Sequence, residues 1–118
     1  MNPRELVFAA VRGHDLTARQ LVKDAAREAF SWSEAPAPDF MRRSRCAAVY
    51  AGLVELLAER QGTAPPAWTK EVGPAPKTLF LVRQAKTSKA LRRMSEAQTP
   101  APLKSRNVRA LADYLDVL

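Results

Sequence analysis

The stretch FMRRSRCAAVYAGLVELLAERQG, residues 40–62, decides the fold. Asp39 directly precedes it, and aspartate is one of the side chains that commonly cap a helix N-terminus. Gly62 ends the stretch, and glycine is the residue most often found just past a helix C-terminus. The apolar side chains between them recur at helical spacing on one face; they are Cys46, Ala47, Tyr50, Leu53, Val54 and Leu57. The pattern predicts a long helix over residues 40–60.

Upstream of this helix, the sequence predicts a helical hairpin over residues 3–30. Asn2 is a good N-cap and Pro3 suits the first helical position, so a first helix should begin there. Thr17 opens a T-x-x-Q capping box, which predicts a second helix that runs on to Phe30. Both segments carry one apolar face, and we expect the hairpin to pack against the long helix.

Downstream of the long helix, residues 61–76 predict an irregular loop. Prolines interrupt this segment, and proline cannot continue a helix interior. Trp68 is its largest side chain and would bury more apolar area than any neighbour in a thin, alanine-rich core. We therefore expect Trp68 to pin the loop to the body of the protein.

The remaining elements are short. Residues 78–82, TLFLV, fit either a strand or a buried helical turn, because periodicity alone does not distinguish the two. We favour a helix, since no second strand is evident for pairing. Ser88 is expected to open a helix over residues 89–97 with Leu91 and Met94 facing inward.

The C-terminal end of the sequence predicts one more helix. Thr99-Pro100 reads as a cap and first position of a short turn before it. Asn107 is the expected cap of the last helix. Its expected inner row is Val108, Leu111, Ala112, Leu115 and Leu118.

These elements predict an all-α fold, a compact bundle of five to six short helices with an irregular Pro/Trp loop. At 118 residues the chain is expected to form one domain, residues 1–118. Its parts are the hairpin 3–30, the long helix 40–60 and the C-terminal half 63–118. We expect the later short helices to wrap around Trp68, Phe80 and the C-terminal leucines.

Positive charge is concentrated in the second half. Residues 1–62 carry nine basic and eight acidic side chains, whereas residues 63–118 carry ten and four. Glu96 is the one acid between Lys77 and Arg109, a stretch with nine bases. Like charges in a small fold repel one another, so such a block more often serves a partner than the fold.

Seven of these bases are the predicted contacts with a partner: Lys86, Lys89, Arg92, Arg93, Lys104, Arg106 and Arg109. Against phosphates they would release counterions and make binding steeply salt-dependent. Against an acidic protein, the arginines would supply bidentate contacts and fast, steered association. The sequence leaves the choice between a nucleic acid and an acidic protein open.

The sequence argues against an enzyme, and we predict no catalytic residue, metal site or cofactor. His14 is the single histidine and Cys46 the single cysteine, which rules out a His/Cys metal cluster. The four glycines lie too far apart for a phosphate-binding loop. The lone cysteine, the absence of a signal-peptide pattern and the short apolar runs favour a cytoplasmic protein without a membrane span.

The N-terminal hairpin also fits a DNA-binding helix-turn-helix. Residues 16–25 look like the supporting helix of such a motif, and a recognition helix should follow within a few residues. Here the helix instead runs on toward Phe30, and two prolines follow. Its charges are nearly balanced, so we favour a hairpin that buries its apolar face. DNA binding by the hairpin or by the basic block is kept as the alternative.

The second half contains an ordered series of short motifs. They are Leu53–Arg60 (LVELLAER), Pro66–Thr69 (PAWT), Phe80-Leu81, Leu91-Arg92, Thr99–Leu103 (TPAPL) and Arg106–Val108 (RNV). This series resembles a group of small bacterial antitoxin-like proteins, and it covers about residues 47–109. Two positions depart from the pattern: Leu103 stands where an arginine is usual, and Arg109 where an apolar residue is usual.

The resemblance implies a non-enzymatic, antitoxin-like protein of a toxin–antitoxin system. Its partner would be a cognate toxin, of the nucleotidyltransferase type in many of the similar proteins. The basic C-terminal half would bind and neutralise the toxin, with Trp68 and Asn107 holding that surface in shape. The alternative is a DNA-binding transcriptional regulator.

Overall fold

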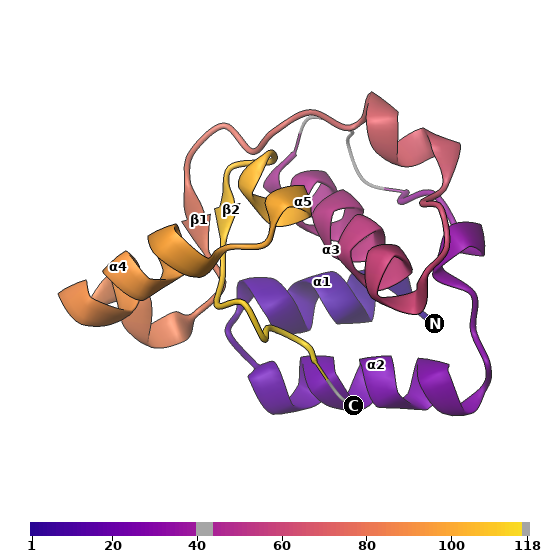
Figure 1. Cartoon of the computed structure of the whole chain (residues 1–118), viewed down its shortest axis with the longest axis horizontal. Helices are drawn as coiled ribbons and strands as arrows, with labels where there is room; N and C mark the ends of the chain where they lie inside the picture. Colours follow the sequence, from indigo (N-terminus) through magenta and orange to yellow (C-terminus); the bar gives the residue numbers. More distant parts are fainter. Residues whose placement is uncertain (40–43, 117–118) are drawn as a thin grey trace.

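The structure is a computed structural model, and it describes residues 1–39 and 44–116. Five α-helices dominate it: α1 (Pro3–Val11), α2 (Asp15–Arg27), α3 (Arg45–Gln61), α4 (Lys89–Gln98) and α5 (Ala101–Lys104). Short 3₁₀ turns occupy Trp32–Glu34, Ala67–Glu71 and Arg83–Lys86. Two strands of two residues each, β1 (Leu79–Phe80) and β2 (Val108–Arg109), complete the fold (Figure 1). The predicted all-α class is confirmed.

Helix α3 forms the centre of the core, with α1 and α5 packed against it (Figure 1). Every residue from Ala47 to Ala58 is buried except Glu55, which is half-buried. The predicted single inner face is therefore too narrow, because neighbours cover the helix on nearly all sides. Gly52 permits one close approach: a Cβ there would lie 2.8 Å from the Cδ2 atom of Leu103.

The start of α3 differs from the prediction. Ser44 caps it, with the Ser44 Oγ accepting a bond of 3.1 Å from the Ala47 amide. Asp39 instead forms an ion pair of 3.1 Å with Arg4 of α1. The first four residues of the predicted helix, 40–43, lie outside the described residues. Its end is as predicted, with Gly62 in the left-handed region at φ 79°.

The hairpin is present, but its second helix is shorter than expected. The Asn2 side chain caps α1 by accepting from the Arg4 amide at 3.0 Å, as predicted. Helix α2 begins at Asp15, before Thr17, and ends at Arg27, so the capping box at Thr17 is wrong. Phe30 follows the helix and packs edge-on against Trp32, with the ring centroids 5.0 Å apart.

Residues 79–80 form a strand, which corrects the prediction of a helix there. Strand β1 pairs in parallel with β2, Leu79 opposite Val108 and Phe80 opposite Arg109. The Leu79 amide donates to the Asn107 carbonyl at 3.0 Å, and the Leu81 amide to the Arg109 carbonyl at 2.9 Å. The partner strand lies where a last helix was expected.

The predicted C-terminal helix is therefore also wrong. After β2 the chain continues through turns to Asp116 along the end of α3. Arg60 of α3 binds this segment by donating to the carbonyls of Tyr114 at 2.6 Å and Ala112 at 3.1 Å. Those carbonyls thus find a partner outside their own segment. Of the predicted inner row, Val108 and Leu115 are buried, whereas Ala112 is exposed and Leu118 lies outside the described residues.

Helix α4 begins after Ser88 as predicted, with the Ser88 Oγ accepting from the Leu91 amide at 3.3 Å. The prediction that Leu91 and Met94 face inward is wrong. Met94 is 43% exposed and Leu91 is half-buried, while Ser95 is the one buried residue of the helix. The helix lies at one edge of the molecule and packs mainly on the turn Arg83–Lys86 (Figure 1).

Trp68 lies in the 3₁₀ turn that follows the prolines, half-buried against α3. Its ring stacks on Tyr50 with centroids 5.3 Å apart and planes inclined by 12°. The Trp68 Nε1 donates to the Ala35 carbonyl at 2.9 Å, and the Tyr50 hydroxyl donates to the Pro36 carbonyl at 2.8 Å. These contacts join the Pro/Trp loop to the segment before α3. Within the described residues, no helix is long and apolar enough to cross a membrane.

Candidate functional site

The fold divides the seven predicted contact residues into two groups. Lys89, Arg92, Arg93 and Lys104 are exposed. Arg106 is 7% exposed, and the Arg109 side chain is 14% exposed. The side chain of Lys86 lies outside the described part of the chain. Sequence proximity therefore does not place these bases on one surface.

Arg106 is wrong as a partner contact, because it lies in the core. Its guanidinium forms an ion pair with Glu55 of α3 and donates to the Thr69 carbonyl at 2.7 Å. A longer bond of 3.4 Å reaches the Pro102 carbonyl. We call Glu55, Thr69 and Arg106 the inner junction. It joins α3, the Pro/Trp loop and the end of α5, so this arginine serves the fold.

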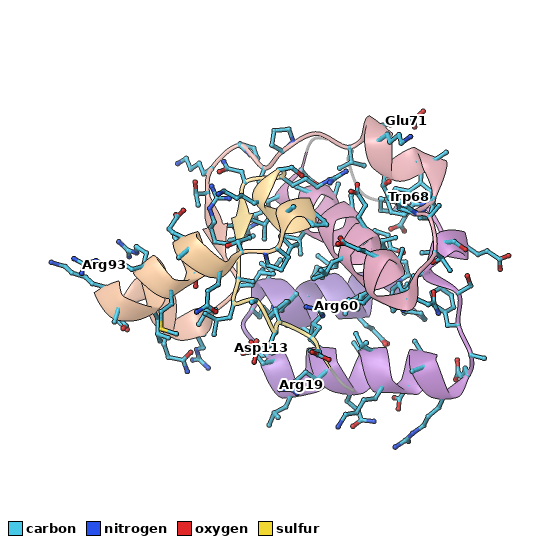
Figure 2. All side chains as sticks on the ribbon, in the orientation of Figure 1. Arg19, Arg60, Trp68, Glu71, Arg93 and Asp113 are labelled. Atoms are coloured by element: carbon cyan, nitrogen blue, oxygen red, sulfur yellow. The ribbon has the colours of Figure 1, made fainter. Side chains whose placement is uncertain are left out.

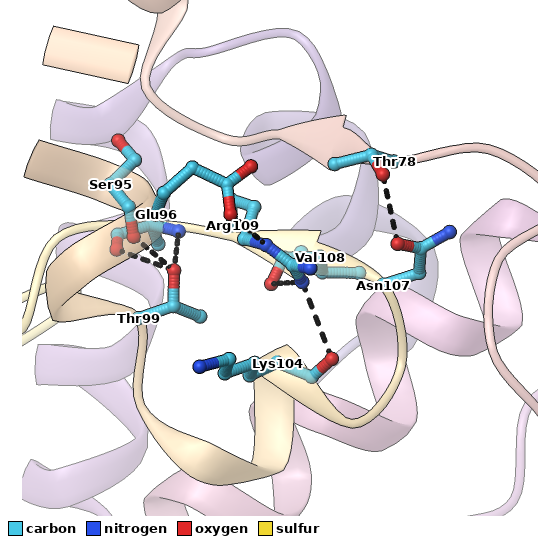
Figure 3. A network of polar contacts seen from close by, with 9 residues as sticks. Thr78, Ser95, Glu96, Thr99, Lys104, Asn107, Val108 and Arg109 are labelled. Carbon is cyan, nitrogen blue, oxygen red and sulfur yellow. Dashed lines mark hydrogen bonds and ion pairs between the residues drawn. The ribbon is translucent and has the colours of Figure 1, made fainter. Parts of the chain in front are cut away.

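Arg109 is largely enclosed as well and holds α4 to β2. Its Nε donates to Glu96 of α4 at 3.0 Å, and its Nη1 donates to the Lys104 carbonyl at 3.3 Å (Figure 3). Thr99 adds to the same connection, since its Oγ1 contacts the Ser95 carbonyl and accepts from the Ala110 amide at 3.2 Å. The one acid of the basic block is thus paired within the protein, although its side chain is 49% exposed.

Asn107 does not cap a helix, which corrects its predicted role. It adopts a left-handed backbone conformation, φ 63°, at the start of β2. Its Oδ1 accepts from the Thr78 hydroxyl at 2.9 Å (Figure 3). Its Nδ2 donates to the Ala75 carbonyl at 3.2 Å. The residue therefore ties the Pro/Trp loop to the strand pair.

Most of the predicted contact residues that are exposed lie on the outer side of α4. Lys89, Arg92, Arg93 and Met94 are all exposed, and we call them the α4 surface. Arg93 points away from the body of the protein (Figure 2). The Arg92 guanidinium lies 5.7 Å from the centroid of the half-buried Phe80 ring and donates to the Ala85 carbonyl at 3.3 Å. This surface is cationic and carries one apolar side chain.

A second basic site was missed by the sequence analysis. An open cavity of about 860 Å³ lies between the α1–α2 turn, the start of α3 and the β1 region. We call it the basic groove. Its lining residues are Val11, Arg12, His14, Arg45, Leu79, Arg83, Gln84 and Thr87. Three arginines and a histidine from three parts of the sequence therefore surround one cavity, and no described residue of its lining is acidic.

Gly13 allows the basic groove to form. It adopts φ 72°, and a Cβ there would lie 2.8 Å from the Arg83 Cβ. The α1–α2 turn can thus approach the turn Arg83–Lys86 only because this position lacks a side chain. That approach brings Arg83 beside Arg12 and His14. Neither Gly13 nor Arg45 carries a local sequence signal that would indicate this site.

A neighbouring cavity extends the basic groove. It measures about 380 Å³ and is lined by Arg45, Pro76, Lys77, Thr78 and Leu79. Arg45 and Leu79 line both cavities, so the two are adjacent. Positive charge therefore continues from the α1–α2 turn past the start of α3 to Lys77.

Asp15 directly follows His14 in the sequence, but it does not line the basic groove. Asp15 lines a separate cavity of about 210 Å³ with Arg19 and Tyr114. Burial raises the pKa of the Asp15 carboxyl, and nearby Arg19 partly opposes that shift. Among the described residues, no group of three His, Cys, Asp or Glu side chains could hold a metal ion.

Comparison of the chain with protein families, with curated proteins and with solved structures finds no match.

Proposed function

We propose that this chain is a non-enzymatic, antitoxin-like protein that neutralises a toxin by docking the α4 surface on an acidic region of that toxin. The observation that carries the proposal is the exposed cationic side of α4. The resemblance of residues 47–109 to antitoxin-like proteins supplies the class of partner. The toxin would be of the nucleotidyltransferase type.

The form of α4 supports protein docking. The helix buries one residue, Ser95, and most of its other side chains are exposed. Met94 adds apolar area beside the charges. Helices that present a few apolar and charged side chains in this way commonly fit a groove of a partner. Charge complementarity would steer the encounter and raise the association rate at low salt.

Arg106 and Arg109 do not belong to the α4 surface, but their contacts hold α4 and α5 in place. Arg109 fixes Glu96, so that acid is engaged away from the partner. Arg106 holds α5 against α3 and the Pro/Trp loop. In the proposal these two residues position the helix, while Lys89 and Arg93 contact the toxin.

The experiment is co-expression with the protein encoded by the adjacent gene, followed by a pull-down and a growth assay. We expect co-purification and rescue of growth. The double variant K89E/R93E should lower the affinity at least tenfold, mainly through slower association. The control K23E/K70E makes the same charge change on exposed residues outside the α4 surface and should bind as the unmodified protein does. Neither binding nor rescue would overturn the proposal.

DNA binding by the N-terminal hairpin finds less support. Several charged side chains of α2 bind other groups of the protein: Arg19 donates to the Asp116 carbonyl at 3.0 Å, and Asp24 accepts from Gln20 and pairs with Arg27. A helix that reads the major groove usually presents free bases or amides. The alternative function therefore rests on the basic groove, which is a separate site.

A further inference from the structure

We propose that the basic groove binds the phosphodiester backbone of a nucleic acid without regard to sequence. This site shares no lining residue with the α4 surface. The proposal is therefore independent of toxin docking, and either can hold without the other.

The first argument is the charge that the fold gathers there. Arg12, Arg45 and Arg83 line a single cavity together with His14. The ion pairs among the described residues use other arginines: Arg4, Arg27, Arg106 and Arg109. Three guanidinium groups without an acid in one cavity repel one another, so their arrangement costs stability that a bound anion would recover.

The second argument is the chemistry of the donors. A guanidinium group presents a planar fork of N–H donors that matches phosphate oxygens in a bidentate fashion. Gln84 and Thr87 add neutral donors to the same lining. Side chains of these types are the ones that contact phosphates in protein–DNA interfaces.

The third argument concerns what the groove lacks and how far it extends. Among the described lining residues there is no Phe, Tyr or Trp, and His14 supplies the one ring, so the groove offers little platform for stacking a base. The adjacent cavity prolongs the positive lining to Lys77 and Thr78. A cationic groove with so little aromatic surface, continued by a second cavity, suits a chain of regularly spaced phosphates better than a single nucleotide.

Gly13 shows that the site depends on tertiary packing. The left-handed turn at Gly13 lets Arg83 approach the α1–α2 turn. Arg12 and His14 come from the α1–α2 turn, Arg45 from α3 and Arg83 from the turn Arg83–Lys86. In Figure 1 the α1–α2 turn, β1 and the Arg83–Lys86 turn all lie toward the same side of the molecule as α4.

The test is fluorescence anisotropy of a short labelled duplex of random sequence, titrated with the full chain from about 50 to about 200 mM salt. We expect binding at the low-salt end that weakens steeply as salt increases. The triple variant R12Q/R45Q/R83Q should reduce the slope of log K against log salt by about 2 to 3, because each phosphate contact contributes about 0.9.

Two control variants make the result specific to the groove. K23Q/R27Q/K70Q removes three charges from exposed positions elsewhere and should change the slope little. R12K/R45K/R83K retains the charges, so it should keep most of the slope and shows that changes at these positions leave a folded protein. Circular dichroism checks the fold of each variant.

Competition identifies the class of anion. Unlabelled duplex should displace the probe, whereas polyglutamate at the same charge concentration should displace it poorly. Three results would overturn the proposal: no duplex binding at low salt, an equal loss of slope in the two glutamine variants, or equal displacement by polyglutamate. The last would assign the groove to an acidic protein.

Discussion

The inner junction and the α4 surface use the same kind of side chain in opposite ways. Arg106 is 7% exposed, pairs with Glu55 and donates to a loop carbonyl. Arg93 is exposed and points away from the body of the protein (Figure 2). The two residues lie thirteen positions apart within one basic block. Charge density along a sequence therefore does not measure charge density on a surface.

The difference follows from what surrounds each arginine. At the inner junction, α3 supplies a carboxylate, and the Pro/Trp loop supplies a carbonyl, so the buried cation is compensated. On α4 the outer residues face solvent, and the acid of that helix is engaged by Arg109. Stability experiments should separate these regions, because replacing a compensated buried cation costs far more than replacing an exposed one.

Replacing Arg106 should cost the most stability. Arg106→Met leaves Glu55 without its ion-pair partner, and the Thr69 carbonyl keeps only the bond from the Val72 amide, so we expect the free energy of unfolding to fall by about 2 to 4 kcal/mol. Urea denaturation measures it. The double variant R106M/E55L should recover much of the loss, because both charges are then absent. If Arg106→Met changed the free energy of unfolding by less than about 0.5 kcal/mol, the inner junction would contribute no more to stability than the α4 surface does.

Arg60 is an intermediate case, since it binds the C-terminal segment through two carbonyls. Arg60→Met should lower the free energy of unfolding by about 1 to 2 kcal/mol, because both charge-assisted bonds are lost. Hydrogen exchange should also accelerate over residues 108–116. Arg27→Met is the matched control: its ion pair with Asp24 is exposed, so its removal should have little effect. Equal effects in the two variants would contradict the role assigned to Arg60.

The two buried tyrosines should respond differently to loss of the hydroxyl. Tyr50→Phe removes the bond to the Pro36 carbonyl and should cost about 1 kcal/mol. The Tyr114 hydroxyl is buried and has no hydrogen-bond partner among the described residues, so Tyr114→Phe should leave stability unchanged or raise it. Thermal unfolding of the two variants side by side checks the difference.

The same tyrosines predict a loss of stability at alkaline pH. Burial raises the pKa of both phenols above the ordinary value of 10, and at Tyr114 the charge of Asp15 adds to the shift. The unfolded chain therefore releases these protons first, and stability present below about pH 10 is lost as the pH rises above it. Tyr114→Phe should reduce this loss. Unfolding curves that do not change between pH 9 and pH 11 would contradict it.

The smallest stability effect is expected on the α4 surface. K89E/R93E changes two exposed side chains, so the free energy of unfolding should move by less than about 0.5 kcal/mol. The same variant is expected to lose affinity for the toxin. A destabilisation comparable to that of Arg106→Met would mean that Lys89 and Arg93 stabilise the fold as Arg106 does. The α4 surface and the inner junction would then not differ in their role.

Local signals in the sequence predicted several elements correctly. Asn2 caps α1, Ser88 caps α4 and Gly62 ends α3 in the left-handed conformation. Each of these depends on bonds within a few residues, so the residue type at one position is enough to indicate it. The start of α3 shows the limit: Asp39 and Ser44 are both good caps, and the pairing of Asp39 with Arg4, a residue far away in the sequence, accompanies the use of Ser44.

The strand pair and the basic groove needed information that no local window contains. Strand β1 is two residues long, and its partner lies 29 positions later in the chain. The groove assembles Arg12, His14, Arg45 and Arg83, each of which is an ordinary surface residue in its own segment. Apolar periodicity carries no signal for either feature.

From the sequence alone follow the helical class, several helix ends such as the caps at Asn2 and Ser88, and the surplus of positive charge in the second half. Those properties depend on side-chain type and on contacts a few residues apart. Tertiary structure alone decided which bases are exposed: it enclosed Arg106 with Glu55, set Arg109 against Glu96, and left Arg12, Arg45 and Arg83 around one cavity. The physical reason is that burial and electrostatic compensation depend on distance in space, which the order of residues does not specify.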